Sequence, residues 1–154
     1  MISTAEISKG LVSGKIDLMP IIETAKGVEN ATEIASASSR VRRVAFGGGD
    51  YTLDLDYLWG ADEEVLSYGR ARLSHVSRVA KIDPPIDTVV LQINDDERFL
   101  ASAERGRKFG FGGKLCIRSI CAEAFIFMNQ VPIIFYVTLY NRFENEPKTC
   151  LRFI

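Results

Sequence analysis

Two acidic side chains, Glu23 and Asp50, each follow a short apolar run and are the first candidates for chemistry. Glu23 lies in Leu18–Gly27 (LMPIIETAKG), and Asp50 lies in Val44–Tyr51 (VAFGGGDY). The two residues are 27 positions apart (50 − 23), the length of one strand-helix-strand repeat. In a parallel α/β layer such residues meet at the edge where ligands bind, and two carboxylates there predict a site for Mg²⁺, with Mn²⁺ as the alternative cation.

The elements that must position this pair alternate along the chain between short β-rich runs and longer helical runs, as in consecutive βα units. We expect strands at 16–23, 41–47, 86–92 and 114–117. We expect helices at 28–37, 62–81 and 95–109, with a partial helix at 4–11. Strands that are apolar throughout are typical of parallel sheets buried on both faces. The predicted fold class is therefore α/β with four parallel strands, either half of an eight-stranded barrel or a small open doubly wound sheet.

Five segments of the sequence carry a family resemblance. They are Pro20–Gly27, Phe46–Asp50, Tyr68–Leu73, Pro85–Val89 and Gly110–Ile117. With these segments in this order, residues 16–117 resemble the C-terminal half of the citrate lyase β-subunit-like family. That family belongs to the HpcH/HpaI aldolase superfamily, which also contains malyl-CoA lyases.

The resemblance implies a TIM (β/α)₈ barrel and an Mg²⁺-dependent carbon–carbon lyase. Such an enzyme cleaves a hydroxyacyl-CoA, or a related hydroxy or oxo acid, to an acyl-CoA or enolate product plus an oxo acid. By the resemblance Glu23 and Asp50 hold the metal, and the loop with Gly48 and Gly49 holds the acid group of the substrate. Glycines fit this role because backbone N–H groups that lack a neighbouring Cβ can approach a carboxylate closely. The resemblance assigns no catalytic acid or base here.

Each of these features also has a plainer interpretation. Glu23 could merely cap the next helix, and a triple glycine is by itself more often a tight turn. The two acidic residues taken together favour the metal site. Asp87, inside an apolar strand, could touch a ligand or have a buried structural role, and we leave it out of the site. Arg70, Arg72 and Arg78 share one helix and are expected on a solvated face.

Composition and charge argue against several classes of function. The chain has 19 Lys and Arg against 20 Asp and Glu, which leaves no basic surplus for nucleic acid. The uncharged run 124–140 contains Asn129, Gln130 and Pro132 and is shorter than the ~20 apolar residues of a spanning helix, so we expect no membrane span. The three cysteines lack paired metal spacing and no signal peptide is recognisable, which favours the cytoplasm.

Two departures from the family pattern limit the expected activity. The sequence begins about one helix before the strand of Glu23, so four earlier βα units, with an arginine for the substrate carboxylate, are expected to be absent. After Ile117 the chain reads Arg118-Ser119-Ile120 where the family has His-Pro-Ser, and one inserted nucleotide accounts for the change. We therefore expect residues 1–117 to form a partial barrel and residues 118–154 to be an atypical tail read out of frame.

The expected partners follow from this incomplete barrel. Its first and last strands would be open edges, which favour pairing with a second copy, as a homo-oligomer, or with a complementary N-terminal chain. The small-molecule partner would be a hydroxy or oxo acid or its CoA thioester. Two alternatives to the lyase stay open: a non-catalytic remnant or partner subunit that keeps the metal pair, and a 2-oxo acid aldolase that needs no CoA.

Overall fold

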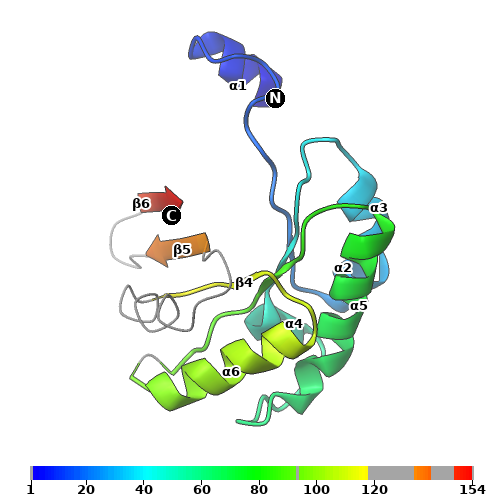
Figure 1. The fold of residues 1–154 in the computed structure, drawn as a ribbon, viewed down its shortest axis with the longest axis vertical. Coiled ribbons are helices and arrows are strands. Elements are labelled where there is room, and N and C mark those ends of the chain that lie inside the picture. Colours follow the sequence, from blue (N-terminus) through cyan, green and yellow to red (C-terminus); the bar gives the residue numbers. More distant parts are fainter. Residues whose placement is uncertain (1, 93, 118–133, 140–147, 154) are drawn as a thin grey trace.

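The computed structural model describes residues 2–92, 94–117, 134–139 and 148–153, and Figure 1 shows their arrangement. The helices are α1 (Ile2–Ser8), α2 (Ala25–Glu29), α3 (Ala31–Ser36), α4 (Gly48–Asp54), the 3₁₀ turn η1 (Glu64–Leu66), α5 (Ser67–Val79) and α6 (Asp96–Lys108). The strands are β1 (Ile21–Ile22), β2 (Ala45–Phe46), β3 (Ile86–Asp87), β4 (Gly113–Lys114), β5 (Ile134–Leu139) and β6 (Lys148–Phe153).

The first four strands form one parallel sheet whose spatial order is the order of the chain, β1-β2-β3-β4. Ala45 of β2 pairs with Ile21 on one side and with Ile86 on the other. A doubly wound sheet reverses its strand order at a switch point, whereas a barrel does not. The unbroken order therefore decides between the two predicted architectures, in favour of half of a (β/α)₈ barrel.

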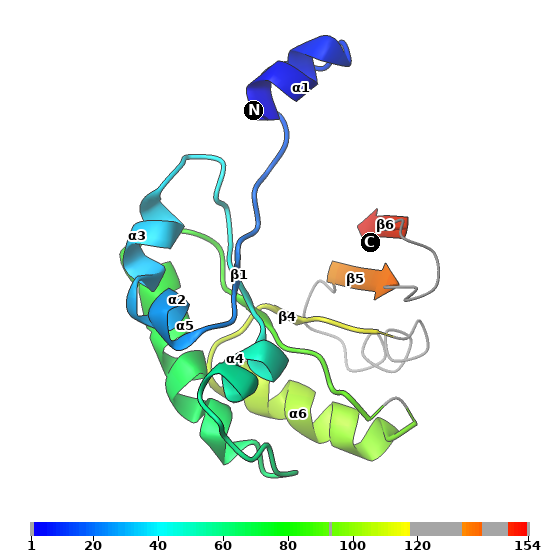
Figure 2. The ribbon, with the colours of Figure 1, turned by 180° about the vertical axis from the view of Figure 1, so that it is seen from behind.

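Apolar side chains pack on both faces of this sheet. Phe46 and Leu73 belong to the larger layer, between the strands and helices, whereas Ala45 and Ile86 belong to a smaller layer on the opposite face. Ala45 and Phe46 lie in different layers because successive strand residues point to opposite faces. Helices α3 and α5 lie side by side along one side of the sheet (Figures 1 and 2). The prediction of strands buried on both faces is confirmed for β2, β3 and β4, but it is wrong for the edge strand β1, where Ile21 is exposed.

Several elements differ from their predicted ranges. Each strand of the parallel sheet is only two residues long, shorter than the predicted 16–23, 41–47, 86–92 and 114–117. The expected partial helix at 4–11 is α1 at 2–8, and the expected helix at 62–81 is η1 followed by α5. The expected helix at 28–37 is two short helices, α2 and α3, which meet at Asn30. Helix α4 was not predicted at all, because it begins within the triple glycine and glycine is a poor helix former. This helix places Asp50 in its first turn, so it matters for the site.

The prediction that Arg70 lies on a solvated helix face is wrong. Its side chain is fully buried and donates to both carboxylate oxygens of Asp87, at 3.0 and 2.9 Å, and to Glu63 at 2.7 Å. Lys114 Nζ lies 3.3 Å from the same Asp87 carboxylate. The structural role considered for Asp87 is thus observed. Arg78, on the same helix, is exposed as expected. Arg70 can be buried because Asp87 of β3 and Glu63, the residue before η1, supply the opposite charges.

Strands β5 and β6 pair antiparallel, with Ile134 opposite Phe153 and Leu139 opposite Lys148. Residues 118–133, where the change of reading frame is expected, lie outside the described residues, so the out-of-frame tail stays a prediction. Of the uncharged run at 124–140, only 134–139 are described, and they are a strand. Among the helices of the described residues, none has the length and apolar character needed to cross a bilayer.

Candidate metal centre

Glu23 and Asp50 lie at the same edge of the sheet, just beyond the ends of β1 and β2. Ile22 pairs with Phe46, so the residues that follow, Glu23 and Gly47, are also opposite one another. The Gly47 N–H donates to the Ile22 carbonyl at 3.0 Å, which extends the strand pairing to this point. Asp50 comes three residues later, in the first turn of α4. The structure therefore brings together the two acidic residues that the sequence singled out.

The side chain of Glu23 lies directly against the backbone of Gly47. A Cβ atom added to Gly47 would be 2.5 Å from Glu23 Cβ and 2.8 Å from Glu23 Oε2, closer than real Cβ atoms approach such groups. The φ of Gly47 is −95°, which any residue can adopt, so glycine is required here for space and not for conformation. Gly47 thus allows the Glu23 carboxylate to reach the start of α4.

The two carboxyl groups are coupled electrostatically. The pKa of Glu23 is raised above its usual value by partial burial, then by the negative charge of Asp50, and by a hydrogen bond between the two side chains. A neighbouring like charge disfavours ionisation because two carboxylates repel at short range. A proton shared between these side chains, or a bound cation, relieves that repulsion. This electrostatic arrangement is the one that a cation site requires.

The two glycines expected to hold the substrate differ in their surroundings. The Gly48 N–H already donates to Thr88 Oγ1 at 2.9 Å, and a Cβ at Gly48 would lie 2.9 Å from that oxygen. A Cβ at Gly49 would meet only Trp59 Cζ3 at 3.8 Å, an ordinary contact distance. Gly48 is therefore explained by packing against β3, while Gly49 has room beside it. Their contact with substrate remains a prediction.

The donor set of the site matches a hard cation with an open coordination shell. Within the described residues, no group of three or more His, Cys, Asp or Glu side chains is gathered in a position to hold a metal ion. Glu23 and Asp50 would therefore supply two protein ligands. Mg²⁺ is commonly held by one or two carboxylates, with water and substrate oxygens completing its octahedral shell. The residues present fit such an ion.

The sequence did not indicate three residues that shape this site: Gly47, Thr88 and Asp54. Thr88 holds the start of α4, and Asp54 Oδ2 at its end accepts the Ala25 N–H at 2.8 Å. The requirement for Gly47 could have been suspected from the triple glycine, but its contact with Glu23 depends on the pairing of β1 with β2. Thr88 and Asp54 carry no sequence signal of their own.

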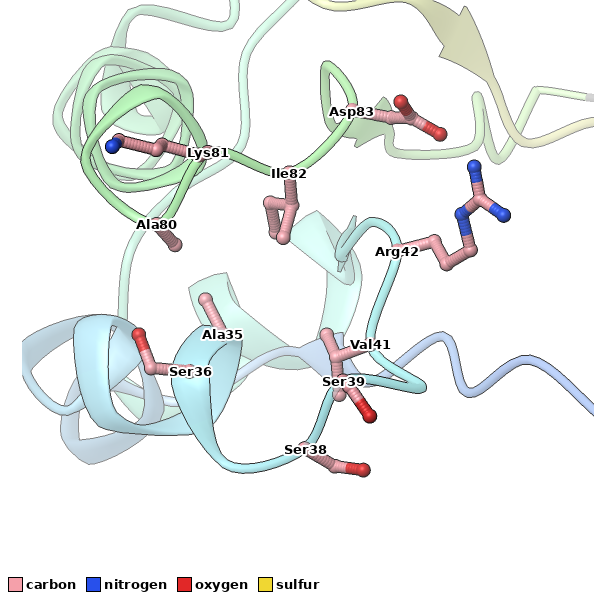
Figure 3. A pocket seen from close by; sticks show the side chains of 10 residues that line it. All are labelled: Ala35, Ser36, Ser38, Ser39, Val41, Arg42, Ala80, Lys81, Ile82 and Asp83. Carbon is pink, nitrogen blue, oxygen red and sulfur yellow. The ribbon is translucent and has the colours of Figure 1, made fainter. Parts of the chain in front are cut away.

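A cavity of about 380 Å³ opens at the other end of the sheet from Glu23 and Asp50 (Figure 3). Val41, which precedes β2, and Asp83, which precedes β3, are among its lining residues. In Figure 3 the side chains of Ala35 and Ile82 point into the same space, while Lys81 and Arg42 lie on opposite sides of it. The cavity is therefore separate from the carboxylate pair.

Four parallel strands in unbroken order, with two carboxylates at the carboxyl ends of adjacent strands, define half of a (β/α)₈ barrel with a candidate cation site. The sequence profile of the HpcH/HpaI aldolase/citrate lyase family matches residues 1–119. The chain belongs to this family, which confirms the resemblance found in the five segments.

Two relatives illustrate the match. Citrate lyase subunit beta of Leuconostoc mesenteroides subsp. cremoris is 38% identical over 117 residues, covering 76% of this chain and 38% of the relative. Citrate lyase subunit beta-like protein of Deinococcus radiodurans is 38% identical over 96 residues, covering 62% of this chain and 33% of the relative. The chain thus spans only about a third of the length of these curated relatives.

Solved structures show the same fold. A citrate lyase from Burkholderia xenovorans LB400 superposes with a TM-score of 0.71 at 17% identity, covering 81% of this chain and 41% of that one. The citrate lyase beta subunit of M. tuberculosis, complexed with oxaloacetate and magnesium, superposes with a TM-score of 0.60 at 24% identity, covering 77% and 53%. Both matches cover part of a longer chain, in agreement with a partial barrel.

Proposed function

We propose that this chain carries the metal-binding half of an Mg²⁺-dependent carbon–carbon lyase, with Glu23 and Asp50 as the protein ligands of the metal and Mn²⁺ as a substitute. The observation that carries the proposal is the meeting of these two carboxyl groups at the ends of β1 and β2, where the charge of Asp50 raises the pKa of Glu23. Membership of the aldolase/citrate lyase family supports a lyase. The M. tuberculosis relative, with its bound magnesium and oxaloacetate, supports the metal and an oxo-acid ligand.

The proposed reaction cleaves a hydroxyacyl-CoA, or a related hydroxy or oxo acid, to an acyl-CoA or enolate product plus an oxo acid. A divalent cation bound at such a site acts as a Lewis acid that stabilises the negative charge developing on an enolate oxygen. Glu23 and Asp50 hold that cation at the carboxyl edge of the sheet. Since the Gly48 N–H is taken by Thr88, the Gly49 N–H is the better candidate to orient the acid group of the substrate.

The partner of the half sheet is a second part of the proposal. Strands β1 and β4 are the two edges of the parallel sheet. Ile21 of β1 is 46% exposed, whereas both residues of β4 are buried and β4 contacts β5. Open edges favour pairing with further strands. We expect a second copy of this chain or a complementary N-terminal chain at the β1 edge, and light scattering of the purified chain distinguishes a homo-oligomer from a monomer.

Thermal unfolding with and without Mg²⁺ tests the metal site. A ligand that binds only the folded state at a hundred times its dissociation constant adds about 2.7 kcal/mol to stability. We expect Mg²⁺ or Mn²⁺ to raise the melting temperature of the wild type by several degrees and to leave Asp50→Asn unchanged. Asp56→Asn is the matched control: Asp56 is an exposed carboxylate nearby with φ of 53°, a conformation that asparagine tolerates.

The result that contradicts the proposal is equally direct. An equal rise in melting temperature for wild type and Asp50→Asn would mean that the cation binds elsewhere on the chain. No rise in the wild type at millimolar Mg²⁺ or Mn²⁺ would mean that the pair does not form a metal site in this chain.

A further inference from the structure

Helix α4, which carries Asp50, is tied at each end to a neighbouring part of the sheet edge. At its start the Gly48 N–H donates to Thr88 Oγ1 at 2.9 Å, and at its end Asp54 Oδ2 accepts the Ala25 N–H at 2.8 Å. The helix spans only Gly48–Asp54, and Gly47 provides no side-chain cap at its N-terminus. Such short helices are marginal by themselves, so contacts outside the helix must hold α4 in place. Tyr51 anchors its middle in the core, packed edge-on against Phe46, and the two ties fix its ends.

The first of these hydrogen bonds, from Gly48 to Thr88, is buried, and Thr88 is itself held by a hydrogen bond from β4. Thr88 follows β3 and is 1% exposed. Its backbone carbonyl accepts a hydrogen bond of 2.7 Å from Lys114 Nζ, the lysine of β4 that also contacts Asp87. Thr88 is thus fixed by the third and fourth strands, and through its hydroxyl it fixes the residue that begins α4.

The second tie joins α4 to the segment that carries Glu23. Ala25 is the first residue of α2 and lies two residues after Glu23. The first N–H groups of a helix have no partner within the helix, and the Thr24 hydroxyl accepts the N–H of Gly27, not that of Ala25. The Asp54 carboxylate therefore satisfies a helix-start donor that would otherwise face solvent, and its negative charge is favourable there.

Together the ties oppose the repulsion between Glu23 and Asp50. One sets α4 against β3, and the other sets α4 against the loop that follows Glu23. If either were lost, Tyr51 would still anchor the middle of α4, but one end of the helix would be held less firmly against the repulsion between the two carboxylates. A metal ion would then have to bring them back together, which weakens its binding because preorganisation of the ligands is lost.

We infer that Thr88 and Asp54 are positioning residues that hold the Glu23 and Asp50 carboxylates at the separation one divalent cation requires. The inference rests on the proposed metal site but concerns residues that do not touch the metal. It predicts that metal affinity depends on a threonine hydroxyl beyond β3 and on a carboxylate oxygen at the far end of α4.

Titration of the full chain with Mn²⁺, following the free ion by electron paramagnetic resonance, tests this. Loss of a group hydrogen-bonded to a metal ligand typically weakens affinity by about 10- to 100-fold. Thr88 and Asp54 hold the backbone beside the ligands and not the ligands themselves, so we expect losses at the lower end of that range, about tenfold, for Asp54→Ala and Thr88→Val. Asp54→Asn keeps an acceptor oxygen and Thr88→Ser keeps the hydroxyl, so both are expected to bind within about threefold of wild type. This rescue separates the hydrogen bond from the charge of Asp54 and from general damage to the fold.

Asp95→Ala is the matched control. Asp95 is an exposed carboxylate that accepts one backbone N–H, that of Arg98 at 2.9 Å, at the start of α6. Its removal costs a helix cap of the same kind, but it is far from α4 in the chain and should leave Mn²⁺ affinity unchanged. Because Asp54 is also exposed, Asp54→Ala is expected to remain folded and carries the test even if Thr88→Val does not.

The outcomes separate the inference from the function on which it rests. Wild type that binds Mn²⁺, with Asp54→Ala equal to it, overturns the positioning role and leaves the metal site standing. An affinity loss in Asp54→Asn as large as in Asp54→Ala overturns the hydrogen-bond explanation in favour of charge. Wild type that binds no Mn²⁺ removes the metal site itself, and with it this inference.

Discussion

Two groups of charged side chains in this molecule behave in opposite ways. Around Asp87 of β3, Arg70 contacts both Asp87 and Glu63, and Lys114 also contacts Asp87. All four side chains are buried. Burial alone would lower the pKa of Arg70, but the charges of Asp87 and Glu63 outweigh it and raise the pKa. At the carboxyl edge of β1 and β2, by contrast, Glu23 has a carboxylate as its neighbour, and its pKa is raised by burial and by that like charge.

The difference distinguishes charges that stabilise the fold from charges that destabilise their own ionised form. The charges of the Arg70 network neutralise one another and connect α5, β3, β4 and η1, so the network holds these elements together. In the Glu23–Asp50 pair, the negative charge of Asp50 disfavours the ionised form of Glu23. Like charges placed together are stabilised by a proton shared between them or by a bound cation, and the proposed metal site rests on the second of these.

The largest effect should come from unbalancing the Arg70 network. Arg70→Met leaves Asp87 and Glu63 buried with one cation fewer, and removal of one partner from a buried ion pair costs about 3–5 kcal/mol. Urea unfolding should show a loss of that size. Arg78→Met, on the exposed side of the same helix, should cost less than about 1 kcal/mol. Similar losses in both variants would mean that burial of the network contributes little.

A methyl group at Gly47 should damage the metal site more than one at Gly49. The Gly47→Ala Cβ would overlap Glu23 at 2.5 Å, whereas the Gly49→Ala Cβ would meet only Trp59 at 3.8 Å. We expect Mn²⁺ affinity to fall by about tenfold or more in Gly47→Ala, because Glu23 is pushed aside, and by much less in Gly49→Ala. Competition with a fluorescent chelator measures both. Equal losses would place the metal away from Glu23.

A third pair of charges extends the comparison to acid pH. The pKa of Glu6 is lowered to about 2, first by its hydrogen bond to Arg40 and then by the N–H groups of Gly14 and Ile16. A carboxyl with a lowered pKa stabilises the fold above its ordinary pKa of 4.5 and loses that contribution as pH falls toward 2. Stability of the wild type should therefore fall across this window more steeply than that of Glu6→Gln. Parallel pH profiles would contradict the role of this ion pair.

The smallest effect has an unusual sign. Because the pKa of Glu23 is raised, the carboxyl favours the folded state at low pH and loses that contribution as pH rises through its folded value. Without metal, Glu23→Gln should therefore be slightly more stable than wild type at pH 8, by less than about 1 kcal/mol because solvent screens a partly exposed group. Differential scanning calorimetry in chelator measures this. A less stable variant would indicate that Glu23 is structural.

Features that depend on the order of the strands could be predicted from the sequence, whereas features that depend on side-chain packing could not. The proximity of Glu23 and Asp50 could be predicted from the sequence because residues that follow adjacent parallel strands lie at the same edge of the sheet. The burial of Arg70 could not, because its partners lie 7 and 17 residues away and only folding brings them to one helix face. Helix α4 was missed because Gly47 and Gly48 are there for close contacts with Glu23 and Thr88, which no local pattern reveals.

The most direct test of the central claim is the number of Mn²⁺ ions bound per chain by wild type, Glu23→Gln, Asp50→Asn and the double variant. The account predicts one ion for wild type, a large loss of affinity in each single variant, and little further loss in the double variant, because both carboxylates serve one ion. Independent, additive losses would mean that the two carboxylates do not share a cation. Unchanged binding in either single variant would contradict the metal site outright.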